Sequence, residues 1–236
     1  MPTFQNTFVY KVIDEISKTA TFGTGAKING NGFVQRTNIS GVVTIPPIMD
    51  GYTIISLSYY SLRQCNLITE LILPNTLTTL EVASLTWLEL ITHIVFPASI
   101  EVFKDSIDYL FNATQIIFEP NSKLKYVGNN FLRHCFKLEV LVLPPSLKYI
   151  GLNNCFTNDY ALRIIIYLGE GDFQNVLPFV NCSSDIRIYV SRSYPSQMFS
   201  DRKVLQFFDF NCKTVNHYSN FFSLRNIVLY SVFILV

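Results

Sequence analysis

A short apolar stretch that ends in proline recurs along the chain, and this repeat restricts the fold more than any other feature. The five copies are Val43-Thr44-Ile45-Pro46, Leu71-Ile72-Leu73-Pro74, Ile94-Val95-Phe96-Pro97, Ile116-Ile117-Phe118-Glu119-Pro120 and Leu141-Val142-Leu143-Pro144. Their prolines are 28, 23, 23 and 24 residues apart. The stretch Ile165-Ile166-Tyr167 fits as a sixth copy that lacks the proline. A period of this length is typical of a chain that stacks one structural unit on the next.

A second apolar pair follows each of the last four prolines. These pairs are Leu77 and Leu80, Ile100 and Phe103, Leu124 and Val127, and Leu147 and Ile150. In the first stretch of each repeat, alternate side chains point inward from a short strand, and proline ends the strand because it has no N–H to donate. The chain then runs back through the second pair and rises by about 4.8 Å into the next coil. The spacing therefore predicts a solenoid in which neighbouring coils share one apolar core.

Two segments resemble a known family. The unit Val43-Thr44-Ile45-Pro46-Pro47-Ile48-Met49-Asp50-Gly51-Tyr52-Thr53-Ile54 resembles the opening coil of BspA-like, or treponemal-type, leucine-rich-repeat proteins. The run Cys135-x-x-Leu138-x-x-Leu141-x-Leu143-Pro144-x-x-Leu147-x-x-Ile150-Gly151 is similar to the family's repeat. The resemblance covers residues 41–168 well and 186–204 loosely, and it weakens around Ser84-Leu85-Thr86-Trp87. Together with the spacing, it implies a β-rich, right-handed leucine-rich-repeat solenoid of about six coils, with a parallel sheet on its concave face and β caps.

The remaining chain divides into caps and a tail. We expect a β cap in residues 1–40, the solenoid in 41–168, an irregular or β cap in 169–225 and an apolar tail in 226–236. Two strands in the first cap, around Phe8–Ile13 and Thr19–Phe22, are expected to pack over the first coil. The Gly-rich residues 23–32 lack the Gly-Lys-Ser/Thr of a phosphate loop, so we interpret them as a loop in this cap.

The segment Ile227–Val236 is the most apolar in the chain, but its ten residues are about half of what a spanning helix needs. Three interpretations stay open: a capping strand, the stub of a membrane anchor, and a tail that touches a membrane. The N-terminal residues lack the charged and apolar regions of a secretory signal.

Composition argues against several functions. Lys and Arg number 18 against 17 acidic residues, so no nucleic-acid partner is expected. The five cysteines are far apart and form no CxxC pair, which indicates buried thiols rather than a metal site. His134 and Cys135 are adjacent, but neighbouring residues of an extended chain point to opposite sides. Asp105 and Asp108 fit either a carboxylate pair or a solvated loop. We expect no catalytic residue, no metal and no cofactor, and therefore not an enzyme.

The concave face is the expected binding surface, because its outward side chains form columns across the coils. The proposed contact residues are Glu70, Ile72, His93, Val95, Gln115, Ile117, Val140, Val142, Ile164 and Ile166. The column from Ile72 to Ile166 is β-branched throughout, which fits either strand propensity on a crowded sheet or an apolar stripe that a partner covers. A protein partner suits this surface, since solenoids offer many weak contacts over a large area.

The family resemblance implies a monomeric adhesion protein at a cell surface that recognises host-cell or matrix macromolecules. The absence of a recognisable signal favours an alternative, an intracellular scaffold that binds a cytosolic protein. The glycosylation triplets at Asn38, Asn112 and Asn181 matter only if the protein is exported.

Overall fold

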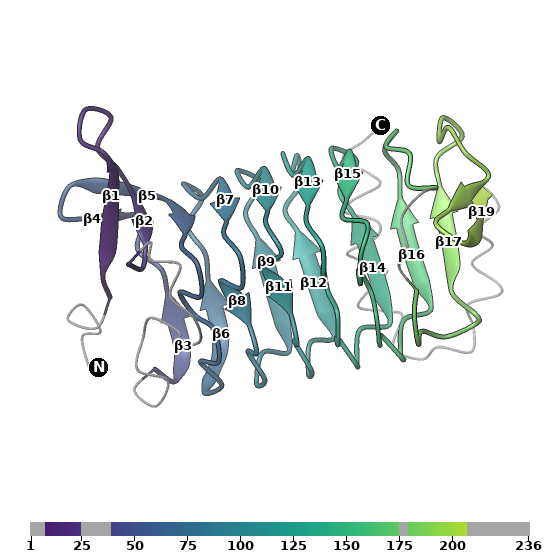
Figure 1. The fold of residues 1–236 in the computed structure, drawn as a ribbon, viewed down its shortest axis with the longest axis horizontal. Helices are drawn as coiled ribbons and strands as arrows, with labels where there is room; N and C mark the ends of the chain where they lie inside the picture. Colours follow the sequence, from purple (N-terminus) through teal and green to yellow (C-terminus); the bar gives the residue numbers. More distant parts are fainter. Residues whose placement is uncertain (1–7, 25–38, 175–178, 207–236) are drawn as a thin grey trace.

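The chain forms a row of stacked coils (Figure 1). The computed structural model describes residues 8–24, 39–174 and 179–206, and within these ranges every regular element is a β-strand. None of the described segments forms a helix long and apolar enough to cross a membrane.

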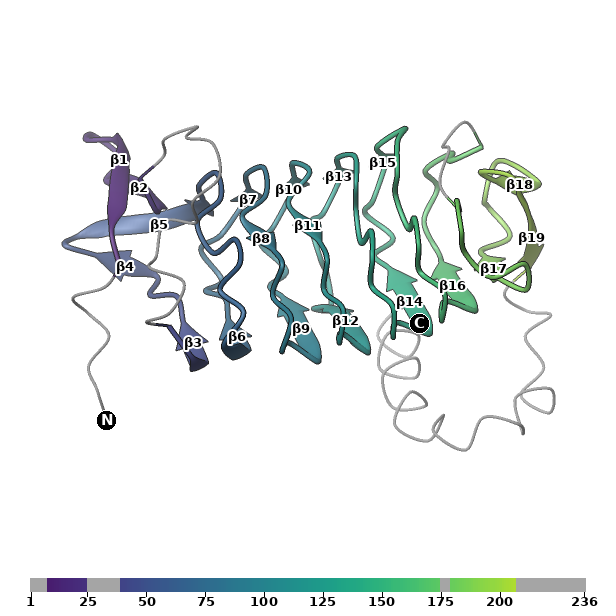
Figure 2. The ribbon, with the colours of Figure 1, turned by 60° about the horizontal axis from the view of Figure 1, so that its bottom comes forward.

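Eight parallel strands, one from each coil, line one side of the row (Figure 2). They are β3 (Gly41–Thr44), β6 (Ile68–Ile72), β9 (His93–Phe96), β12 (Gln115–Phe118), β14 (Val140–Leu143), β16 (Ile164–Tyr167), β17 (Arg187–Val190) and β19 (Arg202–Gln206). We call the outward side of these strands the concave face. Their hydrogen bonds join them in three groups: β3 with β6, β9 with β12, and β14 with β16, β17 and β19. The proline signal predicts about six coils, and β17 and β19 extend the stack without it.

A second sheet forms the opposite side of the coils. Its strands run in the order β1 (Tyr10–Asp14), β2 (Thr19–Phe22), β5 (Tyr52–Leu57), β7 (Thr79–Leu80), β10 (Val102–Phe103), β13 (Tyr126–Val127) and β15 (Tyr149–Ile150), with β4 (Ile48–Met49) antiparallel to β5. A third side contains the short pair β8 (Leu85–Thr86) and β11 (Ile107–Asp108). Each coil therefore contributes side chains to the core from three directions.

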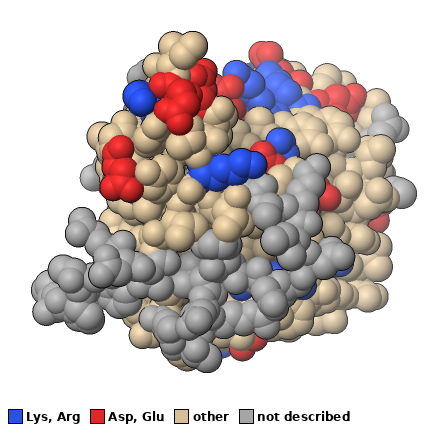
Figure 3. Space-filling model, turned by 60° about the vertical axis from the view of Figure 1, so that its left-hand side comes forward, with Lys and Arg blue, Asp and Glu red and all other residues tan. Residues whose placement is uncertain are grey.

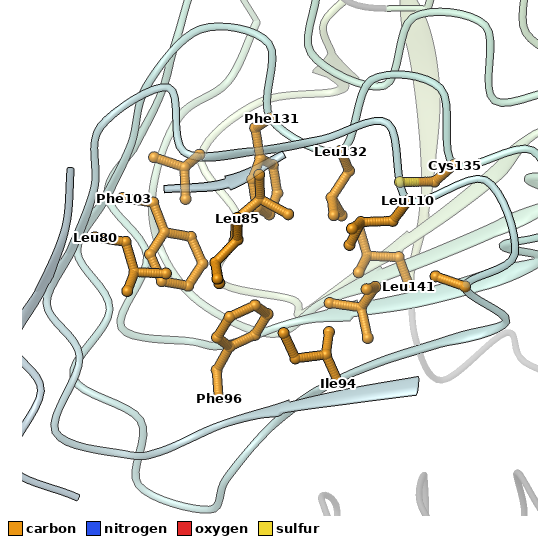
Figure 4. Packing of buried hydrophobic residues seen from close by; sticks show 14 of the residues in the cluster. Leu80, Leu85, Ile94, Phe96, Phe103, Leu110, Phe131, Leu132, Cys135 and Leu141 are labelled. Atoms are coloured by element: carbon orange, nitrogen blue, oxygen red, sulfur yellow. The ribbon is translucent and has the colours of Figure 1, made fainter. Parts of the chain in front are cut away.

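The core is continuous along the stack. Figure 4 shows how Ile94 and Phe96 of the concave strand meet Phe103 from the second sheet and Leu110 from the third side. Both members of every apolar pair that follows a proline are at most 1% exposed. Burying one such side chain stabilises the fold by about 1.5–3 kcal/mol. The prediction that successive coils share one apolar core is confirmed.

The caps differ in how they end the stack. The β1–β2 hairpin is antiparallel, and β2 pairs in parallel with β5, so the expected N-terminal strands do cover the first coil. At the other end, β17 pairs with β16 and β19 with β17, so the stack continues past the expected boundary at residue 168. The short strand β18 (Met198–Phe199) turns back on β19. Most of the Gly-rich loop, residues 207–225 of the expected cap and the tail 226–236 lie outside the described residues.

Candidate functional site

The outward columns of the concave face are in the predicted register. Gln115 pairs with His93 and Ile117 with Val95, while Val140 pairs with Ile164 and Val142 with Ile166. On the first two strands, Val42 pairs with Glu70 and Thr44 with Ile72. The alternation of inward and outward side chains, together with the coil length, is sufficient to fix this arrangement.

Exposure differs strongly among the ten predicted contact residues. Ile72 is 44% and Val95 38% exposed, and His93 is also exposed. The side chains of Glu70, Gln115, Ile117, Val140, Val142 and Ile164 are half-buried. Ile166 is only 2% exposed, so the expectation that it faces solvent is wrong. It lies between Val142 and Tyr189 on the adjacent strands.

A threonine rim borders this surface. Thr114 lies next to Thr92 of the preceding coil: its N–H donates to the Thr92 carbonyl at 2.7 Å, and its hydroxyl donates to the same oxygen at 3.1 Å. Both residues are exposed. The open part of the concave face therefore combines an apolar row with polar side chains along one edge.

A second feature, which the sequence reasoning missed, lies on the third side of the coils. Two rows of stacked rings run across successive coils there, and we call them the aromatic flank. The first row contains Trp87, Tyr109 and His134, and the second contains Phe111, Phe136 and Tyr160. Within the rows, adjacent ring centroids are 4.2–5.5 Å apart and the planes are within 25° of parallel. Consecutive rings of each row are 22 to 25 residues apart in the sequence, and this spacing is the signal that could have revealed the rows.

The first row is held by an unusual backbone conformation. Trp87, Tyr109 and His134 have φ angles of 61°, 56° and 63°, in the left-handed region that bulky residues rarely adopt. Each N–H donates to a carbonyl of the following coil, from Tyr109 to Arg133 at 2.7 Å and from His134 to Thr157 at 3.0 Å. Ring stacking contributes about 0.5–1.5 kcal/mol per pair beyond burial, which helps to offset the strained backbone. Because the rings cover one another's faces, the aromatic flank exposes ring edges. It does not offer the flat ring face on which a bound sugar could stack.

An ion pair lies beside this row. Arg133 Nη2 donates to Asp108 Oδ2 at 2.8 Å, and the Arg133 guanidinium lies 4.8 Å from the centre of the Tyr109 ring. Burial raises the pKa of Asp108 to about 6, although Arg133 acts in the opposite direction. Since Asp108 is 7% exposed and paired with arginine, the interpretation as a solvated loop is wrong for this residue.

The adjacent His134 and Cys135 do not form a catalytic dyad. The His134 ring lies on the aromatic flank, where its Nε2 is 2.8 Å from Asn158 Nδ2, and burial lowers the pKa of this imidazole. The Cys135 thiol is fully buried in the core, and its pKa is raised by burial and by the nearby Asp159 carboxyl. The two side chains therefore point to opposite sides, as expected. Among the described residues, no group of three His, Cys, Asp or Glu side chains could hold a metal ion.

Basic and acidic side chains form ion pairs across consecutive coils. On the second-sheet side, Lys104 pairs with Glu81 at 2.8 Å and Lys125 with Glu101 at 2.9 Å, each bond joining consecutive coils. On the face that Figure 3 shows, basic and acidic side chains are intermixed. Such a distribution does not resemble the clustered positive field that binds a polyanion.

The sequence matches the model of the BspA-type leucine-rich repeat region in six copies, over residues 26–163. The chain belongs to this family. A search of the curated proteins gave no match. Its family and fold make the chain a repeat protein of the kind that mediates protein interactions, but they identify no ligand.

Two solved structures share the fold. A leucine-rich-repeat protein of T. pallidum is 14% identical, with a TM-score of 0.58, over 78% of this chain and 84% of that protein. The pneumococcal vaccine antigen PcpA is 16% identical, with a TM-score of 0.50, over 80% of this chain but only 49% of that protein. At this identity the likeness concerns the fold alone.

Proposed function

We propose that the open part of the concave face binds an extended segment of another protein. The observation that supports this most directly is that Val95 and Ile117 pair in register and form part of an outward apolar row. His93 and Gln115, which also pair in register, border this row. Contiguous exposed apolar surface with a polar rim is typical of interaction sites. A row of parallel strands gives such a partner many contacts of modest strength.

We further propose that this binding serves adhesion at a cell surface, with host-cell or matrix proteins as partners and the protein acting as a monomer without enzymatic activity. The family membership supports this proposal, and the pneumococcal structure bears the description of a vaccine antigen. An intracellular scaffold for a cytosolic protein is the alternative. Labelling of intact cells with an impermeant reagent separates the two, since labelled protein supports adhesion and an unlabelled protein contradicts it.

Binding is tested with the purified full chain and a panel of immobilised extracellular matrix proteins. The double variant Val95→Asp/Ile117→Asp should weaken binding roughly 10- to 100-fold, because charged side chains replace the centre of the apolar row. The matched control is Tyr126→Asp/Tyr149→Asp on the second sheet, where the two tyrosines are 38% and 42% exposed. Undiminished binding by the concave-face variant, or an equal loss in the control, would contradict the proposed site.

A further inference from the structure

A line of side-chain hydrogen bonds joins three consecutive coils on the third side. His134 Nε2 lies 2.8 Å from Asn158 Nδ2, and Asn158 Oδ1 accepts a hydrogen bond from Asn181 Nδ2 at 2.9 Å. The Tyr160 hydroxyl also donates to Asn158 Oδ1, at 3.4 Å. We call His134, Asn158 and Asn181 the amide ladder. Since Asn158 Oδ1 accepts two bonds, its Nδ2 is the group that faces the imidazole, and His134 Nε2 is the acceptor.

The amide ladder holds His134 in its neutral form, with the proton on Nδ1. That nitrogen is buried and has no hydrogen-bond partner among the described residues. A protonated imidazole would carry an N–H on both nitrogens, and neither would have an acceptor, because Nε2–H would face the amide N–H groups of Asn158. The imidazolium fits only if the Asn158 amide turns over. That turn would place its Nδ2 against the Nδ2 of Asn181.

The charges around the imidazole also disfavour its protonation. The titratable and charged groups there come from three consecutive coils: Asp108 and Tyr109, Arg133 and Cys135, and Asp159 and Tyr160. Burial raises the pKa of Asp108 to about 6 and that of Asp159 well above its usual range. Both carboxyls are therefore largely neutral in acid and give an imidazolium no counter-charge. Arg133 stays positive at every such pH and repels it.

We propose that the aromatic flank opens in acid at His134. A proton on the imidazole releases the ring from Tyr109 and breaks the amide ladder, while the apolar core stays packed. Release uncovers the face of the Tyr109 ring on which the imidazole stacks at neutral pH. This response belongs to the third side of the coils, and it stands apart from the function proposed for the concave face.

The direction of the pH dependence follows from the position of His134. Burial, and after it the charge of Arg133, lowers the pKa of this imidazole from its ordinary value of about 6.5. A released ring regains the ordinary pKa. The closed flank therefore has its full stability above about pH 6.5 and loses it as the pH falls through the lower pKa of the closed state.

NMR of the full chain with isotope-labelled histidine tests the protonation step. At pH 8, His134 should show a bare Nε2, a proton on Nδ1 and a nuclear Overhauser contact with the Tyr109 ring. It should take up its second proton at a lower pH than the same residue in the urea-unfolded chain, and the contact with Tyr109 should disappear with the same midpoint. A midpoint at or above that of the unfolded chain, or a contact that persists in the protonated ring, overturns the proposal.

Amide hydrogen exchange shows whether the opening is local. The N–H groups of His134 and Asn158 donate to the carbonyls of Thr157 and Val180 at 3.0 and 2.9 Å, and these bonds join consecutive coils. After correction for the intrinsic pH dependence of exchange, their opening should increase roughly fivefold or more from pH 7 to pH 5. The amides of β14 and β16 should keep their protection. Equal opening at the two pH values, or loss of protection in β14 as well, contradicts a local opening.

Two variants assign the response to the imidazole. His134→Phe keeps a ring beside Tyr109 and retains Asp108 and Asp159, but it has no proton to gain, so its opening should not increase in acid. His93→Phe, at the exposed histidine of the concave face, is the matched control and should respond to acid as the parent does. An increase in acid that persists in His134→Phe, or one that His93→Phe removes, would show that another group is responsible.

Discussion

The imidazole of His134 lies flat on the ring of Tyr109, with ring centroids 4.3 Å apart and only 7° between the planes. Trp87 covers the other face of Tyr109 at 4.2 Å. Tyr109 is thus the middle ring of a stack that joins three coils, and the Arg133 guanidinium also contacts it. The aromatic flank ties coils together at a side where the strands β8 and β11 are only two residues long.

The first prediction concerns this middle ring. Tyr109→Ala should lower the free energy of unfolding by about 2–3 kcal/mol, because it removes two stacked contacts and one cation–π contact. Tyr160→Ala, at a ring that is 55% exposed and stacks on Phe136 alone, should cost about 1 kcal/mol or less. Urea unfolding followed by the fluorescence of Trp87, the only tryptophan, measures both. Equal decreases in the free energy of unfolding of the two variants would show that the central position of Tyr109 in the stack adds no stability.

A buried carboxyl gives the second prediction. Asp159 is 0% exposed, its Oδ1 accepts the Cys135 N–H at 2.7 Å, and burial raises its pKa well above the usual range. The folded chain therefore holds a proton that the unfolded chain releases above about pH 3.9, so unfolding free energy falls as pH rises from there toward the folded pKa. Asp159→Asn keeps the acceptor and removes the titration. Chemical unfolding between pH 4 and 8 should show a variant that gains stability over the parent as pH rises, and parallel pH profiles would refute this.

The third prediction uses the ion pair. Asp108 has a pKa of about 6 with Arg133 in place, so Arg133→Gln should raise that pKa further by removing the favourable charge. The unfolding free energy that the protonated Asp108 contributes is then lost over a pH range that extends to higher pH. Carbon-detected NMR titration of the Asp108 carboxyl measures the shift. Arg63→Gln serves as the control, because Arg63 acts on Asp108 only through a weaker charge interaction and should move the pKa less.

The fourth prediction tests the close approach of two coils. A Cβ added at Gly151 would lie 2.4 Å from both the Asn129 nitrogen and the Gly128 carbonyl carbon. These are backbone atoms that cannot move independently, so Gly151→Ala should cost about 1–3 kcal/mol, as for other overpacked sites. Leu152→Ala, next to it and 48% exposed, should change stability by less than about 1 kcal/mol. Thermal unfolding compares the two, and a neutral Gly151→Ala would mean that the coils can separate there.

Much of the fold could be predicted because the core residues repeat at a nearly constant interval. The pairs after each proline, such as Leu124 and Val127, and the register of Val95 with Ile117 follow from that interval and from strand alternation. The strands β17 and β19 were harder to predict, because neither is followed by the proline that marks the earlier copies.

The aromatic flank escaped prediction for a physical reason. Its rings lie in left-handed backbone positions, which the alternation of a strand does not describe, and insertions shift their spacing from 22 residues between Trp87 and Tyr109 to 25 between Tyr109 and His134. The burial of Ile166 could not be predicted either, because strand register specifies which way a side chain points and not what lies above it.

The pairing of Val102 with Thr79 on one side and with Tyr126 on the other repeats the same contact in both directions. Each inner coil thus pairs with the coil before it and the coil after it through corresponding positions. A gene encoding such a chain can gain or lose a whole coil by unequal recombination, and the length of the available surface changes by one strand while the neighbouring junctions keep their geometry.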